Sequence, residues 1–293
     1  MKKIQLSIIM FLLHTAARLP FGALYGLSDA IRFVVEHIIK YRRKVIRLNL
    51  RNSFPDKSEA ELRLIEKAYY KHMCDLIVES VKLLHISDRQ LERHINVRNA
   101  ELVERLAEDG SPIVVFLGHY CNWEWVQEVT RHYARPEVNA EIFRPLRGYV
   151  SNEMFRLIRS RFNTEQIPQQ KAVRRLLQLK NEGKQFLVGF ISDQRPNSTN
   201  LNHWTDFLNQ ETAYAAGGEE IGRHVGAKYI YLDIEKTKRG HYTMTFKDIK
   251  PVDGNEKYPY TLAFMHMLEA TIKRAPQYWL WSHNRWKFKR KTT

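Results

Sequence analysis

The sequence predicts an α/β protein in which a mainly parallel sheet, flanked by helices, follows a helical N-terminal region. From Ile95 onward, short apolar runs alternate with stretches of helical periodicity, a pattern typical of parallel sheets. Two of these runs, 112–117 and 185–192, are apolar except at their ends, as expected for buried strands. The 293 residues suffice for one large α/β domain or two small ones.

Residues 1–94 are expected to be helical. Ser58 and Glu61 have the spacing of a capping box, which predicts the start of a long helix. Apolar residues recur at helical spacing from there to about Leu84, so this helix should pack one face against the core. We therefore predict a helical N-terminal region, 1–94, and an α/β region, 95–293.

The first 27 residues are apolar but interrupted. His14, Arg18 and Pro20 break the run, whereas a spanning helix needs about 20 consecutive apolar residues. A cleaved secretory signal is the alternative interpretation, with Ala16 and Ala17 as a poor cleavage site. We expect residues 1–30 to form a retained anchor that lies in the membrane interface or marginally spans it.

Within the α/β region, the pattern of apolar residues predicts elements in a fixed order. The expected strands are 112–117, 141–144, 185–192, 228–233 and 241–246. The expected helices end near residues 133 and 161, then cover 171–181, 211–225 and 259–274. A polar loop is expected between residue 192 and about residue 210.

The net charge of +15 is concentrated in two segments, 37–55 and 270–293, which hold six and seven basic residues and no acidic one. Aromatic residues such as Tyr278 and Trp279 lie among the second set. Lysine and arginine next to aromatic rings suit the headgroup region of an anionic membrane. A nucleic-acid-binding protein could also carry such segments, so this alternative stays open at the level of composition.

Two cysteines, Cys74 and Cys121, provide neither a disulfide framework nor zinc-ligand spacing. Their small number suits a reducing compartment, and we expect no metal or cofactor. Cys121 lies two residues from His119, so a Cys–His nucleophilic pair has to be considered.

The segment 112–125, PIVVFLGHYCNWEW, is the most informative part of the chain. Its apolar strand ends at Gly118, His119 follows at once, and Glu124 comes five residues later. Asn122 is a suitable N-cap for a following helix whose first turn would hold Glu124. A carboxylate that fixes the imidazole would leave the other ring nitrogen free to take a proton from a hydroxyl. This predicts a His119–Glu124 pair in an enzyme that transfers a group to an alcohol.

The spacing between His119 and Glu124 is weak evidence on its own. With 12 histidines and 32 acidic residues in the chain, about one such match is expected by chance. His132 and Glu137 form a second match, but no strand precedes them and Pro136 lies between them. The setting of strand, glycine, histidine and helix is what favours His119.

Three candidate residues follow the ends of three different strands. His119, Arg144 and Asp193 each come directly after a predicted strand. In open α/β sheets, sites form beyond the carboxyl ends of the strands, so these side chains should converge. An arginine there suits binding of a sugar phosphate.

The segment GHYCNWEW resembles the His-x4-Asp/Glu block of the lipid A late acyltransferases, which transfer lauroyl and myristoyl groups. Mycobacterial phosphatidylinositol-mannoside acyltransferases share this block. The similarity extends, in family order, over about residues 1–290. The further similar segments are IFRP at 142–145, RSR at 159–161, SDQ at 192–194 and YWLWSHNRWK at 278–287.

This resemblance implies a glycerolipid-acyltransferase-like fold and an O-acyltransferase at the cytoplasmic face of the inner membrane. The expected donor is an acyl thioester on acyl carrier protein, with coenzyme A as the alternative, and the expected acceptor is a lipid A precursor. His119 would be the general base, oriented by Glu124. The residues expected to bind substrate are Arg144, Arg159, Asp193 and Gln194.

Three other functions stay open from the sequence. One is acylation of a related glycolipid in place of a lipid A precursor. Another is a thioesterase or hydrolase that uses the same pocket, with water or Cys121 as the nucleophile. The third is a non-enzymatic nucleic-acid-binding protein, which would leave the buried strand and its His119 without a purpose.

Overall fold

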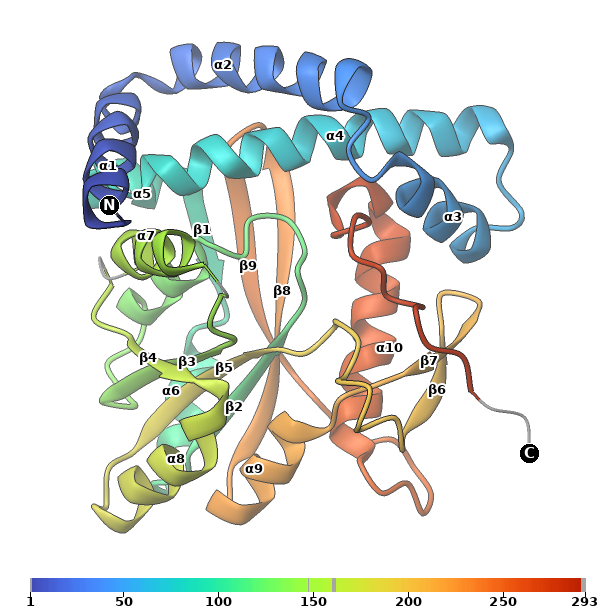
Figure 1. Cartoon of the computed structure of the whole chain (residues 1–293). Coiled ribbons are helices and arrows are strands. Elements are labelled where there is room, and N and C mark those ends of the chain that lie inside the picture. The colour runs from blue at the N-terminus through green and yellow to red at the C-terminus, as the bar shows by residue number, and fades with distance from the viewer. Residues whose placement is uncertain (1, 147, 160–161, 291–293) are drawn as a thin grey trace.

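The computed structural model describes residues 2–146, 148–159 and 162–290, and its main element is a seven-stranded sheet of order β1-β9-β8-β2-β5-β3-β4 (Figure 1). The strands are β1 Ile95–Arg98, β2 Ile113–Leu117, β3 Val138–Phe143, β4 Glu165–Pro168, β5 Phe186–Ile191, β8 Lys228–Lys238 and β9 His241–Asp248. A separate antiparallel hairpin joins β6 Trp204–Phe207 to β7 Gln210–Ala213.

The sheet is mainly parallel, as predicted. Strands β8, β2, β5, β3 and β4 run in one direction, and β9 is antiparallel to β8 and parallel to β1. Strand β2 is buried along its whole length, because it lies between two strands and under helices. The continuous apolar run of this strand follows from burial on both faces.

Helices cover the sheet and one of its ends. They are α1 Lys2–Arg18, α2 Phe21–Phe33, α3 Arg43–Ser53, α4 Glu59–Lys82, α5 Asp88–His94, α6 Glu101–Ala107, α7 Tyr149–Arg159, α8 Ala172–Asn181, α9 Gly217–Val225 and α10 Pro259–Arg274. Short helical turns are η1 Val34–Ile38, η2 Val126–Arg131, η3 Gln169–Lys171 and η4 Pro276–Tyr278. Figure 1 shows α4 crossing one end of the sheet with α2 beside it.

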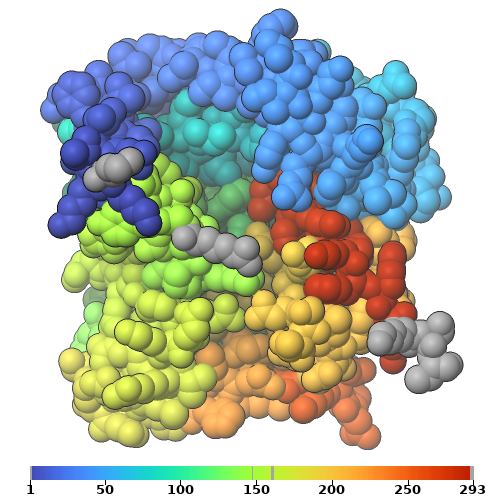
Figure 2. All heavy atoms as spheres, viewed as in Figure 1, coloured from blue at the N-terminus to red at the C-terminus, as the bar shows by residue number. Residues whose placement is uncertain are grey.

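The N-terminal region is helical as predicted. The capping box at the start of α4 is present, since Ser58 Oγ accepts from the Glu61 amide and the Glu61 side chain accepts from the Ser58 amide. Helices α1 to α3 form one margin of the molecule (Figure 2) and expose large apolar side chains such as Phe11 and Leu12. Within the described residues, no helix combines the length and the apolar character needed to cross a bilayer.

The segment after His119 differs from the prediction. A helix capped by Asn122 and reaching residue 133 was expected, but the chain forms turns over 121–125 and then only the 3-10 helix η2. Cys121, just before the expected N-cap, has a left-handed backbone with φ of 51°. Its amide donates to the Tyr278 carbonyl and its carbonyl accepts from His72, so contacts with residues far away in the sequence shape this segment.

The region between β5 and α9 also differs from the prediction. The β6–β7 hairpin begins within the polar loop expected to residue 210 and extends to Ala213, and the helix expected from residue 211 begins only at Gly217. Strand β4, at the edge of the sheet, was not predicted, because it has only four residues and pairs with β3 alone.

The two basic segments are less available to a membrane than their composition suggests. Many of their cations form ion pairs: Arg43 and Arg47 with Glu66, Arg51 with Glu59, Lys273 with Glu269, Arg274 with Asp233, and Arg290 with Glu211. The tryptophans of the C-terminal segment, Trp279, Trp281 and Trp286, are buried. Their expected place among lipid headgroups was therefore wrong, since they pack inside the protein. Lys291 lies outside the described residues.

Candidate active site

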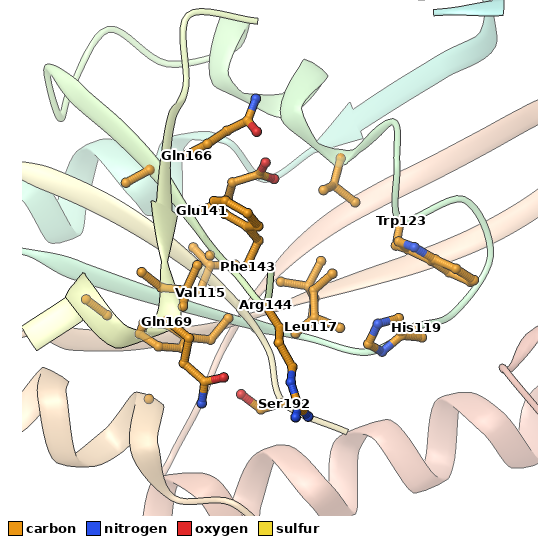
Figure 3. Close-up of a pocket in the computed structure, with 18 of the residues that line it drawn as sticks. Val115, Leu117, His119, Trp123, Glu141, Phe143, Arg144, Gln166, Gln169 and Ser192 are labelled. Carbon is orange, nitrogen blue, oxygen red and sulfur yellow. The ribbon is translucent and has the colours of Figure 1, made fainter. Parts of the chain in front are cut away.

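A cavity of about 710 Å³ opens at the carboxyl ends of β2, β3 and β5 (Figure 3). Its apolar lining includes Val115 and Leu117 from β2, Leu187 from β5 and Val129 from η2. Gly189, in the middle of β5, adds no side chain to the wall. The cavity has the size of a small-molecule site. Its lining is mixed, since these apolar side chains lie beside polar ones such as Gln127 and Glu141, and every predicted site residue except Asp193 lines it.

His119 is placed by the end of β2. Gly118 precedes it and packs against α10, where a Cβ would lie 2.7 Å from Leu268 Cδ1. A larger residue at position 118 would therefore require the buried Leu268 side chain to shift. The His119 side chain lies at the cavity, with Trp123 packed edge-on against it at 5.3 Å between ring centres (Figure 3).

The carboxylate that contacts His119 is Asp193. Nδ1 of His119 lies 2.6 Å from Asp193 Oδ1, and the His119 amide donates to Oδ2 over 3.0 Å. The sheet register explains the contact: Leu117 of β2 pairs with Ile191 of β5, so the residues two positions further on each strand meet.

Asp193 is almost fully buried and accepts a third hydrogen bond, from Trp279 Nε1 over 2.7 Å. Burial alone would raise the pKa of its carboxyl, but the charge of His119 and these hydrogen bonds outweigh it and hold the pKa below its ordinary value. An ionised Asp193 fixes the His119 proton on Nδ1. Nε2 is then an acceptor, and the amide nitrogen of Gln194 lies 3.2 Å from it.

Glu124 is held by Arg159, not by His119. The Arg159 guanidinium donates to both carboxylate oxygens, at 2.9 and 2.8 Å, and Trp123 Nε1 donates to Oε1. Among the described residues, no hydrogen bond or ion pair joins His119 to Glu124. The expected contact is replaced by two others, since Arg159 binds both carboxylate oxygens of Glu124 and Asp193 binds Nδ1 of His119. Both Glu124 and Arg159 line the cavity.

The remaining predicted binding residues also lie at the cavity. Arg144 follows β3, is exposed, and extends toward Ser192 in Figure 3. Gln194 lines the cavity beside His119. Arg159 packs over the Phe155 ring at 5.4 Å as well as pairing with Glu124. Arg161 lies outside the described residues.

Cys121 cannot act as the nucleophile of a Cys–His pair here. Its side chain is completely buried and is not part of the cavity lining that the structure describes. Burial raises the pKa of the Cys121 thiol well above its ordinary value, which disfavours the reactive thiolate.

Sequence reasoning missed Trp279 as a site residue. The segment around it pairs with the turn that follows β2: the Cys121 amide donates to the Tyr278 carbonyl, and the Leu280 amide donates to the His119 carbonyl. The indole of Trp279 then reaches Asp193. The sequence feature that could have pointed to Trp279 is the cluster of aromatic residues at 278–286, which contacts this site.

The family model for bacterial lipid A biosynthesis acyltransferases matches residues 2–288 of the chain. The chain belongs to this family. The resemblance drawn from the sequence blocks is thereby confirmed over nearly the full length. A comparison with curated proteins gives no match.

Membership establishes the general activity: the chain is an acyltransferase of lipid A biosynthesis. The family's substrates are an acyl donor and a lipid A precursor. In this acyltransferase the imidazole of His119 lies at a cavity whose wall combines apolar side chains with charged ones such as Glu141 and Arg159.

Proposed function

We propose that the acyltransferase moves a fatty acyl chain from a thioester of acyl carrier protein to a hydroxyl of a lipid A precursor, with His119 as general base. The observation that carries the proposal is the contact between His119 Nδ1 and Asp193 Oδ1 at the mouth of the cavity. It leaves Nε2 free to accept a proton from a hydroxyl.

The acyl group would move directly from the thioester sulfur to the acceptor oxygen. The acceptor hydroxyl takes the place of the Gln194 amide at Nε2, and its oxygen attacks the thioester carbonyl carbon while Nε2 takes its proton. The tetrahedral intermediate collapses, the carbon–sulfur bond breaks, and the imidazolium returns the proton to the leaving thiolate. An ester and a free thiol result. The Asp193 carboxylate stabilises the imidazolium between the two proton transfers.

The other predicted residues receive separate roles in this proposal. Arg144, exposed at the cavity rim, would bind the phosphate of the acceptor headgroup. Glu124 would hold the Arg159 guanidinium in place at the cavity wall, and Gln194 would hydrogen-bond the acceptor once it leaves Nε2. Asp193, expected from the sequence to bind substrate, would instead orient the base.

We place the enzyme at the cytoplasmic face of the inner membrane. The support is the apolar surface of α1, where Ile4, Ile8, Phe11 and Leu12 are exposed at helical spacing. A helix of this kind lies in the interface with its apolar side in the acyl region. An acceptor already anchored in that membrane could then reach the cavity without leaving the bilayer.

The experiment that tests the proposal is mass spectrometry of lipid A from cells with the gene, without it, and with His119→Ala in its place. We expect one acyl chain to be missing in the last two strains. If lipid A is unchanged and another glycolipid loses a chain, the acceptor assignment is wrong. If the purified enzyme only releases free fatty acid in the presence of the acceptor, it is a thioesterase.

A further inference from the structure

Residues of α4 hydrogen-bond to the turn that carries His119. Three polar residues of this helix, His72, Asp75 and Glu79, are almost fully buried and lie on one helical face. Burying polar groups is costly unless they are hydrogen-bonded. Asp75 contacts Arg239 and Lys236, and the other two reach the turn after β2.

The turn contains a strained residue. Cys121 has φ of 51°, a left-handed conformation that is unfavourable for a residue with a Cβ. Its amide donates to the Tyr278 carbonyl over 2.9 Å, and its carbonyl accepts from Nε2 of His72 over 3.1 Å. The backbone amide and the carbonyl of Cys121 are therefore both hydrogen-bonded. Strain of this kind persists only where the surroundings hold it.

Glu79 holds the next residue of the turn. Nδ2 of Asn122 donates to Glu79 Oε2 over 2.7 Å, and Oδ1 of the same amide accepts from the Trp125 amide over 3.1 Å. The Trp125 indole donates to the Glu79 carbonyl over 3.0 Å. Asn122 is completely buried, so its side chain has one available orientation.

The remaining partners of Glu79 come from outside the turn. Tyr25 of α2 donates to Oε1 over 3.0 Å, and Tyr242 of β9 donates to Oε2 over 2.6 Å. Burial raises the pKa of the Glu79 carboxyl, so an uncharged side chain of the same shape suits this position. A glutamine could keep its carbonyl toward Asn122 and turn its amide nitrogen toward the Tyr25 hydroxyl.

We propose that His72 and Glu79 are positioning residues, which keep the strained turn in the one conformation that points His119 at Asp193 and the cavity. His72 acts as a hydrogen-bond donor to the Cys121 carbonyl, and Glu79 acts as an acceptor for Asn122. The expected effect of these residues on turnover rests on the proposed function of His119. Their expected effect on the His119–Asp193 hydrogen bond is independent of that function.

The test compares variants that keep each hydrogen bond with variants that remove it. Glu79→Gln and His72→Gln keep the acceptor and the donor, whereas Glu79→Leu and His72→Leu remove them. Tyr25→Phe is the matched control, because it removes a hydrogen bond from the Glu79 oxygen that Asn122 does not use. If Glu79→Leu fails to fold, the His72 pair carries the test.

Two measurements are made on each folded variant. The first is kcat and KM with dodecanoyl thioesters of acyl carrier protein and of coenzyme A. The second is the proton NMR signal of His119 Nδ1–H in protein with ¹⁵N-labelled histidine, assigned by its loss in His119→Ala. A proton in a short hydrogen bond to a carboxylate resonates far downfield, so the signal reports the contact with Asp193 without catalysis.

We expect the leucine variants to lose about 10²-fold in kcat, since a misplacement of about 1 Å costs this much, with KM changed little. Their downfield His119 signal should disappear, and the glutamine variants and Tyr25→Phe should keep both properties. The proposal is overturned if folded leucine variants keep the signal, or if the glutamine variants lose as much kcat as the leucine variants. If the wild type transfers no acyl group from either thioester, the proposed function fails while the NMR signal still decides this inference.

Discussion

Replacement of His119 by alanine is expected to lower turnover by about 10² to 10⁴, the usual contribution of a general base. The variant should still fold, because Asp193 keeps its hydrogen bonds from the backbone amide of residue 119 and from Trp279, but its Tm should fall since this buried carboxylate loses one partner. His132→Ala is the matched control, because His132 has the same spacing to an acidic residue but is exposed and does not line the cavity. Equal losses of acyl transfer in the two variants would contradict the assignment of the base.

Asp193→Asn should lower kcat by about 10² to 10⁴, because the amide can accept the hydrogen bond from His119 Nδ1 but cannot stabilise the imidazolium that forms during the transfer. The pKa of the Asp193 carboxyl is held below its ordinary value, so this carboxylate stays ionised, and keeps its contribution to the site, as the pH falls through the ordinary carboxyl range. KM should change little, since Asp193 is not among the described residues that line the cavity. A variant that keeps the wild-type kcat would mean that Asp193 is not the orienting carboxylate.

Glu124→Gln should act mainly on substrate binding. Glu124 pairs with Arg159, so its loss should weaken substrate positioning and raise KM, while kcat changes less. We expect kcat/KM to fall by about 10- to 100-fold, the effect of breaking a bidentate ion pair with limited exposure. Arg159→Gln should have a similar effect. A fall in kcat as large as that of Asp193→Asn, with KM unchanged, would restore the pairing of Glu124 with His119 that the sequence suggested.

The candidate site residues were easier to predict from the sequence than their contacts. His119 and Asp193 were both singled out, and expected to converge, because each directly follows a predicted strand. Their direct contact was not predicted, because it depends on β2 and β5 being neighbours, which only the strand order establishes. The positioning residues on α4 gave no signal at all. A helical stripe that includes His72 and Glu79 has the same pattern as ordinary packing.

At the scale of an element, the middle of β5 should set the length of acyl chain that the cavity accepts. Gly189 pairs with Val115 of β2 and Glu141 of β3, and all three line the cavity. A Cβ at this position would meet only ordinary contacts, at 3.9 Å. Gly189→Leu should therefore fold and fill part of the cavity.

The expected result of Gly189→Leu is a preference for shorter chains. Displacing about three methylene groups costs about 2.4 kcal/mol, which is roughly a 50-fold loss in kcat/KM for a long-chain donor. The ratio of kcat/KM for dodecanoyl and hexanoyl thioesters measures the effect, and the hexanoyl donor serves as the internal control. An unchanged ratio would place the acyl chain elsewhere.

The elements that were predicted correctly are those whose own residue types indicate a buried strand or the start of a helix. Strand β5 is apolar and buried, and α10 begins at Pro259, a residue that favours the first turn of a helix. The segment after His119 could not be predicted, because its shape depends on hydrogen bonds to Tyr278 and His72, far away in the sequence. The β6–β7 hairpin lacks alternation of apolar and polar residues, so it resembled a loop.

For the whole molecule, two features could attach the enzyme to the membrane that is typical of its family: the basic segments and the apolar surface of the N-terminal helices. Many cations of the basic segments form ion pairs with acidic residues of other elements. Polybasic attraction of about 1 kcal/mol per residue applies only to charges that are free to meet the surface. We therefore expect the apolar surface of the N-terminal helices to make the larger contribution to membrane binding.

This leads to a prediction for binding to vesicles of phosphatidylethanolamine with one quarter phosphatidylglycerol. Phe11 and Leu12 are 71% and 59% exposed on α1. Burying each in the acyl region contributes about 1.5 to 3 kcal/mol, so Phe11→Ser/Leu12→Ser should weaken binding by at least about 10²-fold. Val173→Ser is the control, since Val173 is also half exposed but lies on α8, at the opposite end of the molecule (Figure 1).

Flotation in low and high salt separates the apolar from the ionic contribution. Binding of the unmodified chain should largely survive high salt, because screening weakens ion contacts and not apolar burial. Complete release of the unmodified chain by salt would show that free basic residues, and not α1, attach the enzyme to the membrane.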